Sequence, residues 1–194
     1  MQTDRVSWND GSWTHAPAHV EPDGGDLLVT AVEGSDAWRV TSYGFVHDSE
    51  HALVQRLGSE SAVEVTFTAD LTEQFDQAGL FLRASSVQWV KAGLEYADGM
   101  TQCGVVVTDG RSDWSSSPVP GWAGRRATIR ASRAGDAVTI RARVDDEPFR
   151  FIRLLPLDPR VDIDAGPFCC APSRSGLTVR FHSWNTTAPD QSLH

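Results

Sequence analysis

Three consecutive segments of this chain alternate between apolar and other side chains. They are residues 77–83, 89–96 and 102–108, and in each of them every second residue is apolar. A period of two is typical of a β-strand with one face packed on a core. The opposite faces hold aromatic rings, glycines and a few functional groups instead of ordinary charged surface. The sequence therefore predicts three neighbouring strands whose outward faces form a binding trough.

The turn between the second and third segments predicts their register. Asp98-Gly99 is a strong signal for a two-residue hairpin turn, because both central residues must tolerate a positive φ. Counting outward from this turn places Gly93 opposite Gly104, and closing the preceding short connection places Gly93 opposite Gly79. A glycine inside a strand weakens it and marks a bulge or a close approach. The row of glycines predicts either a floor kept bare for a ligand or strong curvature of the sheet.

Short strand-like runs separated by turn signals recur along the chain, and no amphipathic helix of ten residues is found. This pattern is typical of an all-β sandwich or barrel. A chain of 194 residues is long enough to bury one sizeable core. We expect one domain over residues 1–184, followed by a disordered tail at residues 185–194.

Charge and cysteine usage exclude several classes of partner. The formal net charge of −9 at pH 7 argues against nucleic acid and anionic membranes, because phosphate binding needs clustered positive charge. No membrane-spanning or secretory pattern is found, so we expect a cytoplasmic protein. Cys103, Cys169 and Cys170 have neither the parity of a disulfide framework nor zinc spacing. We expect reduced thiols, no metal and no cofactor.

Several segments match one protein family in order and spacing over roughly residues 8–183. The segments are Asp36-x-Trp38-x-x-Thr41-x-Tyr43-Gly44-Phe45, His47-Asp48-x-x-His51, Phe75-Asp76-Gln77-Ala78-Gly79-Leu80-x-x-Arg83, Trp89-Val-Lys-Ala-Gly-x-Glu-Tyr96, Val106-Val-Thr108, Ser112-Asp-Trp-Ser115 and Gly166-Pro167. Together they resemble the concanavalin-like jelly-roll family known as domain of unknown function 1349, with its YesU-like and yeast regulator-of-enolase-like members. The resemblance implies a two-sheet antiparallel jelly-roll sandwich of the concanavalin A-like lectin and glucanase type, with one concave sheet forming the trough. It implies no activity. The family often has a glycine before the histidine of the second segment, where this chain has Glu50, so the place of His51 relative to the trough stays open.

The predicted trough carries the candidate binding residues. Its centre is Lys91, the single lysine beside sixteen arginines. Flat aromatic faces suit stacking on a sugar ring, and convergent polar groups orient a ligand. Arg83 and Lys91 together would favour an acidic group such as a uronate carboxylate, so we expect a saccharide or sugar acid. The candidate ligand-binding residues are His51, Gln77, Arg83, Trp89, Lys91, Glu95, Asp113 and Trp114. We expect Lys91→Met to weaken ligand binding without harming the fold, because residues outside the core contribute little to stability.

Two other functions stay open at this point. A sugar-active enzyme (a lyase, epimerase or isomerase acting on an acidic saccharide) would use Glu95, Lys91 or His51 for proton transfer. A glycosidase would need a second carboxylate beside Glu95, for which Asp113 is the candidate. A protein-interaction regulator of metabolism is suggested by the family label alone. A deep pocket would favour the enzyme, and an open aromatic groove would favour binding. The sequence assigns neither catalytic residues nor an oligomeric state.

Overall fold

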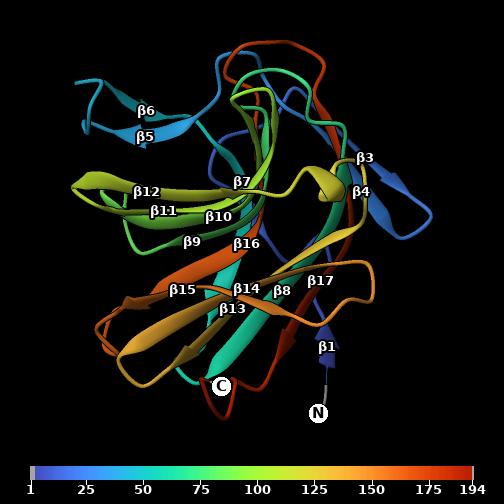
Figure 1. The fold of residues 1–194 in the computed structure, drawn as a ribbon. Helices are drawn as coiled ribbons and strands as arrows, with labels where there is room; N and C mark the ends of the chain where they lie inside the picture. Colours follow the sequence, from blue (N-terminus) through green and yellow to red (C-terminus); the bar gives the residue numbers. More distant parts are fainter. Residues whose placement is uncertain (1–2, 194) are drawn as a thin grey trace.

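The computed structural model describes residues 3–193, which form two antiparallel sheets packed face to face (Figure 1). In spatial order the larger sheet contains β15 (Arg150–Pro156), β14 (Ala137–Val144), β13 (Ala127–Ala134), β8 (Ser61–Ala69), β17 (Thr178–Thr187), β4 (Asp26–Thr30) and β3 (His19–Asp23), and β1 (Thr3–Arg5) pairs with β17. The second sheet contains β12 (Arg111–Pro118), β11 (Met100–Asp109), β10 (Gln88–Ala97), β9 (Gln77–Arg83), β16 (Ile163–Cys170), β7 (His51–Leu57) and β2 (Ser12–Trp13). The expected all-β sandwich is confirmed.

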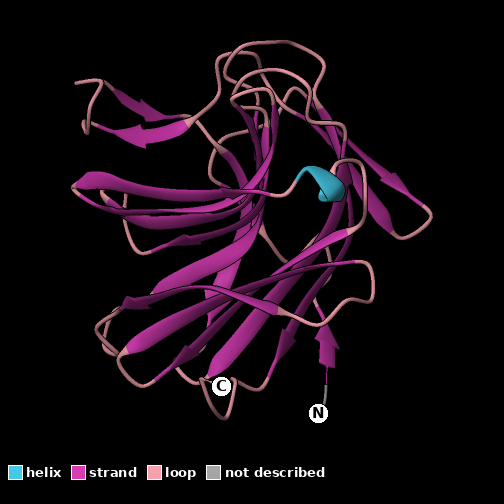
Figure 2. Cartoon of the chain, viewed as in Figure 1, coloured by secondary structure: helices cyan, strands magenta, loops and turns pink. Residues whose placement is uncertain are grey.

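Helical structure is nearly missing from the described part of the chain. Its single helical turn is η1 (Pro120–Trp122), drawn in cyan in Figure 2. None of the helical structure within residues 3–193 is long and apolar enough to cross a membrane. The core instead lies between the sheets, where alternate residues such as Leu80, Val65 and Ile129 are at most 1% exposed. Each such side chain stabilises the fold by about 1.5–3 kcal/mol relative to an exposed one.

The register predicted for the trough strands is confirmed. Gly93 of β10 lies opposite both Gly104 of β11 and Gly79 of β9. The turn between β10 and β11 contains Asp98 and Gly99 with φ values of 54° and 78°, as the hairpin signal requires. Side-chain parity and turn chemistry, both local properties, therefore determine how these three strands pair.

The row of glycines is explained by close approach between strands. A Cβ atom on Gly79 would collide with the backbone carbonyl of Ala92, and one on Gly93 with the carbonyl of Ala78. A Cβ on Gly104 would lie 2.8 Å from the carbonyl oxygen of Ser115. The atoms that would collide are backbone atoms of the neighbouring strands in the same sheet. The glycines therefore permit close approach between neighbouring strands, and Gly93 and Gly104 also line a small hollow beside Lys91 and Glu95, so both explanations given for the glycine row stay predictions.

The C-terminal segment is more ordered than the sequence indicates. β17 continues to Thr187, three residues beyond the expected domain boundary at residue 184. The Asp190 carboxylate accepts hydrogen bonds from Arg130 Nε at 2.9 Å and from Arg141 Nε at 3.0 Å, and its backbone N–H donates to Ser132. The expected disorder from residue 185 onward is thus corrected as far as Asp190; residues 1, 2 and 194 lie outside the described range. These partners lie about fifty residues away in sequence, so local composition gives no sign of them.

A small separate hairpin covers part of the second sheet. It consists of β5 (Ala37–Arg39) and β6 (Val46–Asp48), at the upper left of Figure 1, above β12. The backbone N–H of Arg39 donates to Ser112 Oγ of β12 at 2.9 Å, which ties the hairpin to the sheet edge. The concave face is therefore partly roofed and not fully open as the sequence suggests.

Candidate functional site

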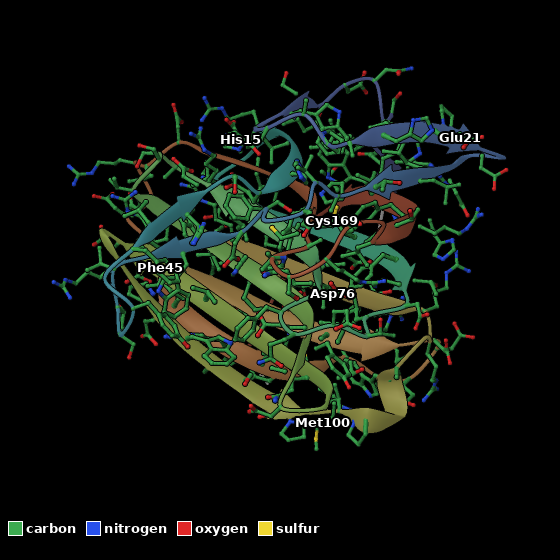
Figure 3. All side chains as sticks on the ribbon, turned by 90° about the horizontal axis from the view of Figure 1, so that it is seen from above. His15, Glu21, Phe45, Asp76, Met100 and Cys169 are labelled. Atoms are coloured by element: carbon green, nitrogen blue, oxygen red, sulfur yellow. The ribbon has the colours of Figure 1, made fainter. Side chains whose placement is uncertain are left out.

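A cavity of about 330 Å³ lies between the hairpin and the concave sheet. Seen from above, the hairpin that carries Phe45 lies across the strands of this sheet (Figure 3). The aromatic rings lining the cavity are those of Trp38, Tyr43, Phe45, Phe75 and Trp114. Its polar lining comes from Asp36, His47, Gln77, Lys91 and Glu95. Rings gather on the hairpin side, whereas the polar groups come mainly from β9 and β10.

The part of the trough around Phe81 and Trp89 is not open, because side chains pack there against each other. Phe81 and Trp89 stack with ring centroids 5.5 Å apart and are only 1% and 4% exposed. They form a second small core with Ala37 of β5 and with Phe168 of β16. The sequence placed Trp89 on an open face for stacking against a sugar, and this expectation is wrong. Period two separates the two faces of a strand but does not reveal that the hairpin covers the outer one.

The hairpin presents a continuous aromatic wall. The rings of Trp38 and Tyr43 pack edge to face with their centroids 5.7 Å apart, and Tyr43 stacks on Phe45 at a centroid distance of 5.3 Å. The rings of Phe45 and His47 also pack edge to face, with centroids 4.5 Å apart. Tyr43 is 58% exposed, and Trp114, which lines the cavity from β12, is 39% exposed. Clustered exposed rings of this kind mark interaction sites on protein surfaces.

Backbone hydrogen bonds fix the hairpin loop that holds these rings. The N–H of Val40 donates to the carbonyl of Phe45 at 2.8 Å, and the N–H of Gly44 donates to the carbonyl of Val40 at 2.7 Å. Gly44 has a φ of 76°, a conformation that favours glycine. The indole N–H of Trp38 donates to the carbonyl of Thr41 at 2.9 Å. The wall is therefore held in place before any ligand arrives.

The floor of the cavity contains a buried ion pair. Lys91 Nζ lies 3.0 Å from Asp36 Oδ1, which also accepts the Ala37 N–H at 2.8 Å and Gln77 Nε2 at 3.1 Å. Burial alone would raise the pKa of Asp36, but the charge of Lys91 and these hydrogen bonds outweigh it and hold that pKa below its ordinary value. Burial would lower the pKa of Lys91, but the charge of Asp36, with smaller contributions from Glu95 and Cys170, holds it above its ordinary value. Both groups are charged, and each neutralises the other.

The Glu95 carboxyl and the Oε1 atom of Gln77 have no hydrogen-bond partner within residues 3–193. Burial raises the pKa of Glu95 to about 7, although the charge of Lys91 opposes the shift; Asp36 and Asp98 add to it. Within residues 3–193 no hydrogen bond or ion pair of the Glu95 carboxyl is found. Gln77 Oε1 is buried and also has no hydrogen-bond partner in this part of the chain. The cavity thus offers the Glu95 carboxyl as a polar group that a ligand can satisfy.

The raised pKa of Glu95 predicts a pH-dependent difference between the wild type and Glu95→Gln. From about 4.5, the ordinary pKa, to about 7, the folded protein holds a proton that the unfolded chain has released. Wild-type stability therefore loses a contribution as pH rises through this window. Glu95→Gln lacks this loss, so its stability relative to the wild type should increase from pH 4.5 to 7 and then stay level. Urea unfolding of both proteins across this pH range measures the difference in their free energies of unfolding. A difference that does not vary with pH would contradict the prediction.

Three further sequence candidates lie away from the cavity. His51 is 3% exposed; its Nε2 accepts the Val32 N–H at 3.0 Å and its Nδ1 donates to the His15 carbonyl at 3.1 Å, so it has a structural role. Arg83 lies at the far end of β9 opposite Trp89 and does not line the cavity. The Asp113 side chain is 68% exposed and pairs with Arg153 at 2.8 Å. The structure thus brings together Gln77, Lys91, Glu95 and Trp114 and leaves out His51, Arg83, Trp89 and Asp113.

The sequence candidates did not include the residues of the hairpin. Asp36, Trp38, Tyr43, Phe45 and His47 line the cavity, yet they lie in a short segment with no sheet-like period. The signal that could have found them is their density: three aromatic residues, one acid and one histidine occur within twelve positions. Phe75, in the turn before β9, was also missed, because it too lies outside any segment with a sheet-like period.

Comparison with known proteins places the chain among relatives of unsettled function. It is 32% identical to Regulation of enolase protein 1 of Saccharomyces cerevisiae, over all of this chain and 98% of that one. A crystal structure of a functionally unknown S. cerevisiae protein is similar at a TM-score of 0.89 and 32% identity, covering 95% of this chain and all of the other. A xylan β-1,4-xylosidase from Bacillus halodurans shares the fold at a TM-score of 0.68 and 14% identity, over 85% of this chain and 33% of the enzyme.

A family model described as "Protein of unknown function (DUF1349)" matches residues 13–189, nearly the whole described chain. This match confirms the resemblance expected from the sequence. The chain therefore belongs to the DUF1349 family.

Proposed function

We propose that the cavity under the hairpin binds a saccharide. Sugar rings would lie against the aromatic wall formed by Tyr43, Phe45 and Trp114, while hydroxyl groups would reach the polar floor. The observation that carries the proposal is the lining of this cavity, where the exposed rings of Tyr43 and Trp114 lie beside the polar side chain of Glu95. Flat apolar rings with a few polar groups among them are the features that hold and orient a sugar. A ligand hydroxyl would supply a hydrogen-bonding partner for the Glu95 carboxyl.

The charges of the floor do not support the acidic sugar that we considered from the sequence. Lys91 is neutralised by Asp36, and Arg83 lies elsewhere on β9. A uronate carboxylate in the cavity would meet Glu95 and no unpaired cation among the described lining residues. We therefore propose a saccharide without an acidic group.

Trp114→Ala should weaken saccharide binding at least tenfold, a loss of about 1.4 kcal/mol, because it removes one side of the stacking surface. The measurement is an NMR titration of the ¹⁵N-labelled protein with a panel of common monosaccharides and disaccharides. Phe151→Ala is the matched control, since Phe151 is a 50% exposed aromatic residue of β15 outside the cavity. Equal affinity in both variants, or no binding by any saccharide of the panel, would contradict the proposal.

A sugar-active enzyme is the second candidate, and Glu95 is the observation that favours it. A carboxyl group whose pKa is raised to about 7 can donate and accept a proton near neutral pH. The adjacent Asp36 is held ionised, so the two carboxyl groups have different protonation states at pH 6. NMR of a bound saccharide over hours would reveal turnover, which Glu95→Gln should abolish. An unchanged sugar spectrum would restrict the site to binding.

A further inference from the structure

We infer that the ligand of this cavity carries a positive charge, so that an amino sugar or a similar hydroxylated amine is preferred over a neutral or acidic sugar. This inference rests on the proposed saccharide-binding function and adds the charge of the ligand. It follows from two properties of the lining, the balance of its charges and the chemistry of its aromatic wall.

The charges of the lining do not cancel. Asp36 and Lys91 form a 3.0 Å ion pair, which leaves the floor without net charge at that point. Glu95 lines the same cavity and has no hydrogen-bonding or ion-paired partner in residues 3–193. Two further ionisable side chains, His47 and Tyr43, line the cavity from the hairpin, and His47 packs edge-on against Phe45. When Glu95 ionises, the floor carries one uncompensated negative charge.

A cation would satisfy this charge better than a hydroxyl group. The Glu95 carboxylate is poorly hydrated, so an ammonium group hydrogen-bonded to it forms a charge-assisted contact that is stronger than a neutral one. An anion would face repulsion in the same place. The single lysine cannot reverse this preference, because its charge is already paired with Asp36.

The aromatic wall favours the same charge. Tyrosine and tryptophan faces carry partial negative charge and attract a cation by about 0.5–2 kcal/mol within about 6 Å of the ring. Tyr43 and Trp114 expose ring surface at the cavity. Rings that accept the C–H face of a sugar can thus also accept its ammonium group, and a carboxylate beside them completes the recognition of an amine.

A matched set of sugars tests the charge preference. Glucose, 6-amino-6-deoxyglucose and glucuronate differ only at C6, and glucosamine places the amine at C2. Each is titrated by NMR into the wild type, Glu95→Gln and Glu21→Gln. Glu21→Gln removes the same charge from an exposed position on β3, far from the cavity in the fold. Thermal melts confirm that all three proteins are folded.

We expect the better of the two amines to bind the wild type and Glu21→Gln about tenfold more tightly than glucose, and glucuronate to bind more weakly than glucose. In Glu95→Gln the ratio of amine affinity to glucose affinity, both measured in that variant, should fall to about onefold. Glucose binding as tightly as both amines, or a preference that persists in Glu95→Gln, would overturn the inference and leave the proposed function standing. If none of the four sugars binds but another saccharide of the panel does, the inference is overturned and the proposed function stands; if no saccharide of either set binds, both are contradicted.

Discussion

Asp36→Ala is expected to destabilise the protein by about 3–5 kcal/mol. The substitution leaves the ammonium group of Lys91, which is 5% exposed, in a cavity floor without its counter-charge. Removing one partner of a buried ion pair is far more costly than its net contribution to stability, because the remaining charge has lost its hydration. It also removes the acceptor for the Ala37 N–H and for Gln77 Nε2. Urea unfolding at pH 7 measures the loss.

The double variant Asp36→Ala/Lys91→Met separates charge from packing. Replacing both partners removes the unpaired charge, so the double variant should be more stable than Asp36→Ala alone. Lys91→Met by itself leaves Asp36 with two hydrogen bonds but without its cation. It should therefore be destabilising, which corrects our expectation that a trough residue matters little to the fold. A loss below about 1 kcal/mol for Asp36→Ala would show that water compensates the charge.

Asp76→Ala is expected to have an effect of similar size, about 3–5 kcal/mol, at the neighbouring turn. Asp76 is fully buried, and its Oδ2 accepts the N–H groups of Thr72 and Glu73 at 3.1 Å and pairs with Arg174 at 2.7 Å. The turn that it holds contains Phe75 in a left-handed conformation, with a φ of 66°, which is costly for a bulky residue. Without Asp76, this turn should lose its order.

Asp76→Ala should also change the shape of the cavity, because Phe75 lines the cavity and its carbonyl accepts a hydrogen bond from Gln77 Nε2 at 3.1 Å. Asp158→Ala is the control, since Asp158 forms an exposed pair with Arg160 that solvent screens. Denaturation curves of the two variants compare them directly. Similar small losses in both would mean that the Asp76 network does not stabilise the turn.

Local rules predicted the part of the site that lies on adjacent strands. The Asp98-Gly99 turn and period-two parity place Gln77, Lys91 and Glu95 on one face and in register. These features depend on two hairpins whose strands follow each other directly along the chain, so they can be predicted from sequence. The same rules correctly place Leu80, Val90 and Val105 on the core face.

The rest of the site depends on contacts between distant segments. Asp36 is fifty-five positions from Lys91, and no local pattern pairs them. The hairpin covers Phe81 and Trp89, which alternation alone placed on an exposed face. β12 was also not identified as a strand, because its serine-rich sequence lacks alternation; it forms an exposed sheet edge that contributes Trp114. Tertiary packing, not local propensity, therefore decides which part of the trough stays open.

The most direct test of the cavity as a saccharide site is an NMR titration that follows the side-chain amide of Gln77 and the indole N–H of Trp114. Binding in the cavity predicts that both signals shift with one common dissociation constant. The indole of Trp184, which is fully buried in the main core, should stay unchanged. Saccharide binding that saturates while the Gln77 and Trp114 signals remain in place would contradict the account.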